Sequence, residues 1–389
     1  MFSGRLERLS LTAPMVFVAV GVVLGTVAAP GLRPGTATVT ALTEATLAWV
    51  LFSDASRVGL RELRHDAGVF GRLLGVGLPL TVAAGGFAAW WLLGLPDPWL
   101  ALLVGAALAP TDAALGAVVV TNPVVPARIR RVLNVESGLN DGIVTPVVML
   151  ALAGAAAAEG HGGSELGALV QLAGGTAVGA AAGAGGGILL RTAGRRDWAQ
   201  ENFAGPAVLA LALLAYAGAV SLHTNGFVAA FAAGLAFGHF AGRGGPKEVF
   251  YLEQTAGLAS LLVWMIFGAV AVPRLPALLD LPMILYALLS LTVIRMIPVA
   301  ISLAGTGLGV RTVLFVGWFG PRGLASIVFA LIAVEELSGT AEPMATAGSP
   351  GGAAEPVVAV IVLTVLLSVV AHGFTAGPLA TRYGRREVA

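Results

Sequence analysis

Residues 110–146, with the sequence PTDAALGAVVVTNPVVPARIRRVLNVESGLNDGIVTP, contain two apolar segments, each with an acidic residue in its interior. The first segment carries Asp112, and the second carries Glu136 and Asp141. A basic patch lies between the two segments and consists of Arg128, Arg130 and Arg131. An ionised carboxylate is unstable in hydrocarbon by several kcal/mol, so acids at mid-membrane usually mark a path for ions or protons. We therefore expect the rest of the chain to hold these acids in the middle of a membrane.

The composition is that of a polytopic membrane protein. Of the 389 residues, 57% are hydrophobic and only 11% are charged, whereas a soluble domain has about 25% charged residues. A formal net charge of +1 argues against a nucleic-acid partner, and the absence of cysteine excludes disulfides and thiolate metal sites. The N-terminus lacks the pattern of a cleaved signal peptide, so we expect the first helix to be retained as an anchor.

Twelve apolar runs are long enough to span a bilayer. They cover residues 9–29, 36–56, 68–94, 99–121, 132–157, 166–190, 204–221, 225–241, 253–272, 280–304, 311–335 and 356–380. Most of the 22 Lys and Arg residues precede the first run or follow an even-numbered run. The positive-inside rule then predicts that both termini lie in the cytoplasm. Because the Arg-, Ala- and Gly-rich composition is typical of GC-rich bacterial genomes, we expect a multi-pass protein of the bacterial inner membrane.

Two of these runs are interrupted. Pro110-Thr111-Asp112 breaks the fourth run, and Gly320-Pro321-Arg322-Gly323 breaks the eleventh. The two runs are an odd number of spans apart, so they cross the membrane in opposite directions. Proline removes an amide donor and glycine loosens the helix, which leaves free backbone groups at each break. Paired, interrupted helices in inverted halves indicate the binding site of a transporter.

The polar residues of the fifth run occupy two neighbouring helix faces. Ser137 and Asp141 are four residues apart and share one face, where they offer the oxygen ligands that a small hard cation prefers. Glu136 and Asn140 share the adjacent face. Glu136 needs a partner to remain charged, and we expect it to form a structural ion pair with Arg295 in the tenth run. Arg295 could instead pair with the acid of the fourth run or extend to the membrane surface.

Four other residues need an interpretation, and three of them have more than one. Asp112 is either a cap that neutralises half-helix dipoles at the crossing of the two breaks or a cation ligand assisted by Thr111. We expect Arg322 to compensate the C-terminal dipoles of the half-helices. Asp54, at the end of the second run, is either a solvated helix-end charge or a gate or accessory ligand. We expect His372, inside the twelfth run, to have a packing role, and pH sensing is the alternative.

Several short motifs occur in the same order as in a known family. They are Thr111-Asp112, the string ESGLND at residues 136–141, Arg295 with Pro298, the run GWFGPRGLA at residues 317–325, and His372-Gly373. Together they resemble the monovalent cation:proton antiporter superfamily, in particular the sodium/proton exchangers of its CPA1 (NhaP/NHE-like) branch. Two features depart from that branch: Ala113 stands where many relatives have proline, and we find twelve spans where thirteen are common.

The resemblance implies the sodium/proton antiporter fold, an all-α membrane protein of two inverted five-helix repeats whose broken helices cross. It also implies a homodimer, with a core domain that moves against a dimer domain. The corresponding division is dimer-domain helices in 1–67, core helices with the ion site in 68–160, a linking helix in 161–203, linker and dimer-domain helices in 204–279, and core helices in 280–389.

The resemblance further implies a cation and proton site centred on Asp141. Thr111, Ser137 and Asp112 would surround a Na⁺ ion together with Asp141. Asn140 would stand in place of a second acid, and Asp54 would complete the site from an early helix.

These features predict a secondary active antiporter that exchanges a monovalent cation for H⁺ across the membrane. Na⁺ is the first candidate, and Li⁺ and K⁺ are alternatives. A carboxylate away from water holds a proton or a cation but not both, so alternating access would couple the two fluxes, one for one and without net charge. We expect no resident cofactor. We also expect no enzymatic activity, because Asp112 and Asp141 lack the Gly-x-Gly-Asp context of intramembrane aspartyl proteases. A carrier of the same architecture for an organic anion or another solute is the alternative function.

Overall fold

A computed structural model describes residues 12–27, 36–57, 66–158, 164–196, 201–242, 245–277, 279–338 and 354–388. Within these ranges the chain is helical and contains no β-strand, which confirms the predicted all-α fold. Each of the twelve predicted spans corresponds to one helix or to one interrupted helix. By length and composition, seven helices of the described chain could cross a membrane, and α2, α7 and α12 are shorter apolar helices.

The helices have the following bounds. The first half of the chain forms α2 (Ala13–Val27), α3 (Thr36–Ser56), α5 (Ala67–Arg72), the π-helical turn η2 (Leu73–Gly77), α6 (Leu78–Leu93), α7 (Pro98–Ala107), α8 (Ala117–Val120), α9 (Ala127–Ala158) and α10 (Glu165–Arg195). The second half forms α11 (Glu201–Ser221), α12 (Gly226–Phe240), α13 (Gly245–Val270), the 3₁₀ turn η4 (Val272–Ala277), α14 (Leu281–Leu291), α15 (Val293–Ser302), α16 (Val310–Trp318), α17 (Leu324–Ser338) and α18 (Ala354–Val388).

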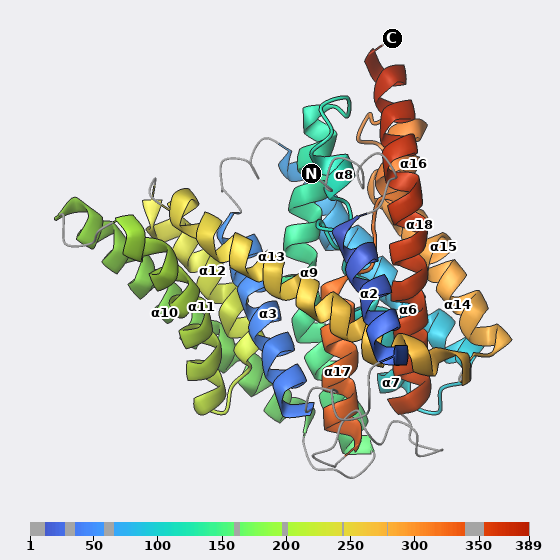
Figure 1. Cartoon of the computed structure of the whole chain (residues 1–389), viewed down its shortest axis with the longest axis horizontal. Coiled ribbons are helices and arrows are strands. Elements are labelled where there is room, and N and C mark those ends of the chain that lie inside the picture. The colour runs from blue at the N-terminus through green and yellow to red at the C-terminus, as the bar shows by residue number, and fades with distance from the viewer. Residues whose placement is uncertain are drawn as a thin grey trace.

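The helices pack in two groups. The first group contains α2, α3 and α10–α13, and the second contains α5–α9 and α14–α18. In Figure 1, α10, α11 and α12 lie at one end of the molecule and α14, α15 and α18 at the other, with α3, α9 and α13 between them. The two groups meet where α9 contacts α3, α10 and α12, where α17 contacts α3 and α13, and where α18 contacts α2. The roles of dimer, linking and core domain remain predictions.

Glycines bring the helices of the first group into backbone contact. A methyl group on Gly179 or Gly183 of α10 would overlap the backbone of α12 at Ala229 and Ala233. Glycines recur every four residues on this helix, at 175, 179, 183 and 187, and small residues at this spacing let two helices approach closely. A methyl group on Gly234 of α12 would likewise overlap the backbone of α3 at Phe52. The position of α3 beside α9 is therefore fixed by α12.

Both predicted helix breaks are present. α7 ends at Ala107 and the chain stays outside regular helix until α8, while α16 ends at Trp318 and α17 begins at Leu324. The breaks cross, because the Asp112 backbone N–H donates to the Pro321 carbonyl at 2.8 Å. One break was not predicted: α14 and α15 are separated at Thr292, whose φ of −115° and ψ of −90° are not helical.

The predicted orientation in the membrane depends on the positions of the basic residues, and several of them lie outside the described ranges. These residues are Arg5, Arg8, Arg33, Arg61, Arg64 and Arg243. The cytoplasmic location of both termini therefore remains a prediction.

Candidate functional site

The polar side chains of α9 lie beside the break that follows α7. Ser137, Asn140 and Asp141 are all buried within α9. The Thr111 hydroxyl lies 2.9 Å from the Ser137 hydroxyl, and Asn140 Nδ2 donates to Thr111 Oγ1 at 2.7 Å. The non-helical segment after α7 is thus attached to α9 by a buried group of hydroxyl and amide side chains.

Asp141 and Asn140 each carry an oxygen without a hydrogen bond. The Asp141 Oδ1 and Asn140 Oδ1 atoms are buried, and neither has a partner among the described residues. Nearly all buried polar atoms in proteins are paired, because burying an unpaired one costs free energy. A bound cation or a proton is the kind of partner that these two oxygens would accept.

Two further acids lie near Asp141. Asp54 of α3 is partly buried and packs against α9, since a methyl group on Gly138 would stand 3.4 Å from Asp54 Cβ. Both Asp54 and Asp112 are close enough to interact electrostatically with Asp141. Within the described part of the chain, however, no three His, Cys, Asp or Glu side chains converge closely enough to hold a metal ion. The arrangement therefore suits one carboxylate with neutral oxygens rather than a cage of carboxylates.

Asp112 lies at the crossing of the two breaks and binds backbone amides. Its Oδ1 accepts from Ala114 N at 2.7 Å, and its Oδ2 accepts from Leu324 N at 3.1 Å. Leu324 is the first residue of α17, where the helix dipole favours a negative charge. A methyl group on Gly323 would overlap the Asp112 carboxylate, so only glycine permits this contact. These contacts are those of a cap at the start of α17, and the role of Asp112 as a cation ligand remains a prediction.

Arg322 occupies the reciprocal position at the crossing. It is fully buried, and its Nη1 donates to the carbonyls of Ala109 at 2.9 Å and Pro110 at 3.3 Å. Its Nη2 donates to the Ser290 carbonyl in the last turn of α14 at 3.1 Å. These carbonyls follow or end helices, where the dipole favours a cation. Arg322 therefore compensates the C-terminal ends that face it.

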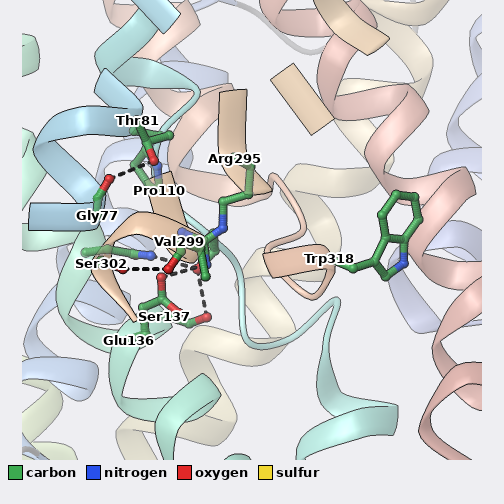
Figure 2. A network of polar contacts seen from close by, with 12 residues as sticks. Gly77, Thr81, Pro110, Glu136, Ser137, Arg295, Val299, Ser302 and Trp318 are labelled. Atoms are coloured by element: carbon green, nitrogen blue, oxygen red, sulfur yellow. Dashed lines mark hydrogen bonds and ion pairs between the residues drawn. The ribbon is translucent and has the colours of Figure 1, made fainter. Parts of the chain in front are cut away.

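Glu136 and Arg295 form a buried ion pair between α9 and α15. Arg295 Nη2 lies 2.6 Å from Glu136 Oε1, and the two side chains are only 2% and 4% exposed, respectively. Figure 2 shows the pair beside Ser137 and Pro110. The alternative partner of Arg295, the acid of the fourth run, binds α17 instead. A methyl group on Gly320 would stand 2.5 Å from Arg295 Nε, which explains a glycine at the second break.

No local pattern in the sequence predicts two further contacts at this site. Ser326 Oγ of α17 donates to the Ala107 carbonyl at 2.6 Å and joins the two broken helices. The Phe231 ring of α12 covers Gly142, the neighbour of Asp141, so closely that a methyl group there would overlap the ring. Nothing in the sequence distinguishes this phenylalanine from the other apolar residues of its helix.

The chain is similar to proteins that carry ions across membranes. A family model described as "Sodium/hydrogen exchanger, transmembrane" matches residues 1–382. The "K(+)/H(+) antiporter NhaP" of Alkalimonas amylolytica is 26% identical over 335 residues, which cover 84% of this chain and 56% of that protein. The "K(+)/H(+) antiporter NhaP2" of Shewanella oneidensis is 27% identical over 343 residues, which cover 85% of this chain and 58% of that protein. The aligned part is thus somewhat more than half the length of these relatives.

The fold is also that of a solved structure. The sodium proton antiporter MjNhaP1 from Methanocaldococcus jannaschii at pH 8 superposes with a TM-score of 0.75 and 21% identity, over 98% of this chain and 95% of that one. At this identity the match establishes the architecture. Because the family model covers almost the whole sequence, the chain belongs to the sodium/hydrogen exchanger family.

Proposed function

We propose that this chain exchanges a monovalent cation for H⁺ by alternating access, with both ions competing for Asp141. The observation that carries the proposal is the pair of buried, unpaired oxygens, Asp141 Oδ1 and Asn140 Oδ1, beside two crossing broken helices. Broken helices near the membrane midplane are where secondary transporters bind their ions. The family and the names of the relatives support the same activity.

The chemistry of the site supports competition. A carboxylate removed from water is unstable when it is charged and unpaired, so it binds whichever cation neutralises it. Asp141 can accept a proton at Oδ1 or bind a metal cation there, but one occupant excludes the other. Thr111 and Ser137 belong to the same buried polar group and offer neutral oxygens to a cation that has lost its water.

The charges around Asp141 support a one-for-one exchange without net charge. Glu136 is paired with Arg295, and Asp112 binds the amides at the start of α17. Asp141 is then the acid of this group that must be neutralised by its cargo. The proposal needs no resident cofactor, because the cation and the proton are both substrates.

The identity of the cation is part of the proposal. The curated relatives are named as K⁺/H⁺ antiporters, and the superposed structure is named as a sodium proton antiporter. Na⁺ and K⁺ are therefore both candidates. We also propose a homodimer in a bacterial cell membrane, with both termini in the cytoplasm.

The experiment is proton flux in vesicles that contain the purified protein and a preset pH gradient. Na⁺, Li⁺ and K⁺ are added in turn to the wild type, to Asp141→Asn and to Asp97→Asn. Asp97 is a matched control because it caps α7 by accepting from Trp99 N, a contact that asparagine can also make. We expect a cation-dependent collapse of the gradient that Asp141→Asn abolishes and Asp97→Asn retains.

Two results would contradict the proposal. A wild type that responds to none of the three cations at any pH would refute antiport and favour a carrier for another solute. A transport rate that follows an imposed membrane potential would refute electroneutral exchange.

A further inference from the structure

A buried polar face on α18 ends at the break between α16 and α17. Ser368, His372 and Thr375 are spaced by four and three residues, so they share one side of the helix. Ser368 and His372 are almost completely buried. Polar groups buried in a membrane protein need internal partners, since no water is present to bind them. Each of these side chains has such a partner on the α16–α17 segment or within α18.

For a neutral His372 ring, the partners are consistent with one assignment of donors and acceptors. The Trp318 carbonyl can only accept, so His372 Nε2, at 2.9 Å, carries the hydrogen. The Arg322 backbone N–H donates to Ser368 Oγ at 2.7 Å. The Ser368 hydroxyl is then free to donate to His372 Nδ1 at 3.1 Å. His372 Nδ1 also lies 3.0 Å from the Ser368 carbonyl, which cannot donate to it. The result is one directed chain of hydrogen bonds from Arg322 to Trp318.

This chain of hydrogen bonds bridges the break between α16 and α17. Trp318 is the last residue of α16 and Arg322 lies two residues before the start of α17, so neither its carbonyl nor the Arg322 amide has a partner within a helix. The Trp318 carbonyl accepts from the Gly320 N–H at 2.8 Å as well as from His372. The Trp318 indole Nε1 also donates to Thr375 Oγ1 at 3.0 Å, and the ring lies 5.1 Å from that of His372. In Figure 2, the Trp318 ring points away from the Glu136–Arg295 pair. α18 therefore binds the chain on both sides of the break.

The same break is connected to the site through Arg322. Its guanidinium binds the carbonyls of Ala109 and Pro110, which immediately precede Thr111. Thr111 in turn contacts Ser137 and the amide of Asn140. A binding site must keep its ligands within about 0.5 Å of the productive geometry, so the support behind them affects affinity.

We infer that Ser368 and His372 are positioning residues for the cation site. They fix the backbone of the α16–α17 break and, through Arg322, the position of Thr111 relative to Asp141. This inference rests on the proposed antiport. It assigns His372 a role in cation affinity that packing alone would not require.

The test compares variants of α18 in the vesicle assay, with the cation concentration varied. Ser368→Ala and His372→Leu interrupt the chain of hydrogen bonds. Ser368→Thr retains the hydroxyl, and His372→Gln retains a side chain with both a donor and an acceptor. Thr364→Val is the matched control: Thr364 is equally buried on α18, but its hydroxyl binds the Val360 carbonyl of its own helix. Unfolding midpoints of all purified variants show which of them are folded.

We expect Ser368→Ala and His372→Leu to raise the KM for the cation about tenfold, the effect of losing one buried hydrogen bond. Their maximal rates should change less, the conservative variants should restore KM, and Thr364→Val should match the wild type. A role in stability alone would lower the amount of active protein and the maximal rate at an unchanged KM.

Three outcomes separate the inference from the proposed function. If the wild type shows no cation-dependent proton flux, the proposed function fails. If the wild type transports and folded Ser368→Ala has the wild-type KM, the inference fails and the antiport stands. If His372→Leu does not fold, Ser368→Ala still decides, because it removes a single hydroxyl.

Discussion

The buried pair of Glu136 and Arg295 offers a quantitative test of how this membrane protein tolerates charge. Replacing Arg295 by methionine would leave Glu136 buried without its partner, at a site where the two side chains are almost inaccessible. Breaking such a pair from one side costs about 3–5 kcal/mol. Arg295→Met should therefore lower the unfolding midpoint strongly, and Glu136→Gln should do so as well, because it strands the arginine.

Removing both charges should have a much smaller effect. A buried ion pair loses hydration from both partners, so replacing it by apolar residues of similar size is often neutral or stabilising. In this pair, moreover, Arg295 Nε has no hydrogen-bond partner in the described structure, so the interaction is not fully satisfied. We expect Glu136→Met with Arg295→Met to recover most of the stability that Arg295→Met loses.

The assay is thermal unfolding of the detergent-purified protein, followed by the fluorescence of its seven tryptophans. The control is Arg57→Met, which breaks the ion pair of Arg57 with Glu253, whose side chains are 45% and 36% exposed. An exposed pair contributes about 0–1 kcal/mol, so this variant should unfold close to the wild type. The reasoning is refuted if Arg295→Met is as stable as the wild type or if the double variant is no more stable than Arg295→Met. Cation-dependent proton flux in the double variant would show that the pair serves structure only.

Three further predictions concern the ion site. Asp112→Asn should retain transport with a loss of about 0.3–1 kcal/mol in stability, because an amide oxygen can still cap α17 but lacks the charge that the helix dipole favours; loss of cation binding, with the protein folded, would make Asp112 a ligand. Gly142→Ala should impair transport because its methyl group overlaps the Phe231 ring, and Phe231→Leu in the same chain should restore it; an active single variant would show that the helices separate freely. If a proton and the cation compete for Asp141, the KM for the cation in the vesicle assay should rise as the pH falls, and a KM independent of pH would indicate separate sites.

Most of the fold follows from patterns that are local in the sequence. Apolar runs of spanning length predict the helices, and Pro110 and Gly320 mark the two breaks. The break at Thr292 has no such mark, because its helix pair contains no glycine and its two prolines lie away from the break. Pro282 is in the first turn of α14, and Pro298 is well inside α15. A tertiary contact accompanies this break, since Arg322 Nη2 donates a hydrogen bond to the Ser290 carbonyl in the last turn of α14.

The site is predictable where one residue requires another. A buried glutamate needs a cation, and Arg295 was one of very few basic residues within the predicted spans, so the two could be matched from sequence. The role of Asp112 could not be decided in this way, because it depends on where α17 begins in space. His372 shows the same limit: one histidine in an apolar run does not reveal that both ring nitrogens bind partners around a helix break.

The glycines on α9 have a mechanical consequence. Gly138 and Gly142 are one turn apart and face Asp54 of α3 and Phe231 of α12, across the boundary between the two helix groups. Helices normally interlock because ridges of side chains on one fit into grooves on the other. Without a side chain at Gly142, α9 has a notch that admits the Phe231 ring of the other group. A movement of one helix group along the other would therefore have to withdraw this ring from the notch. A methyl group at position 142 would fill the notch, whereas one at position 138 would make an ordinary van der Waals contact with Asp54.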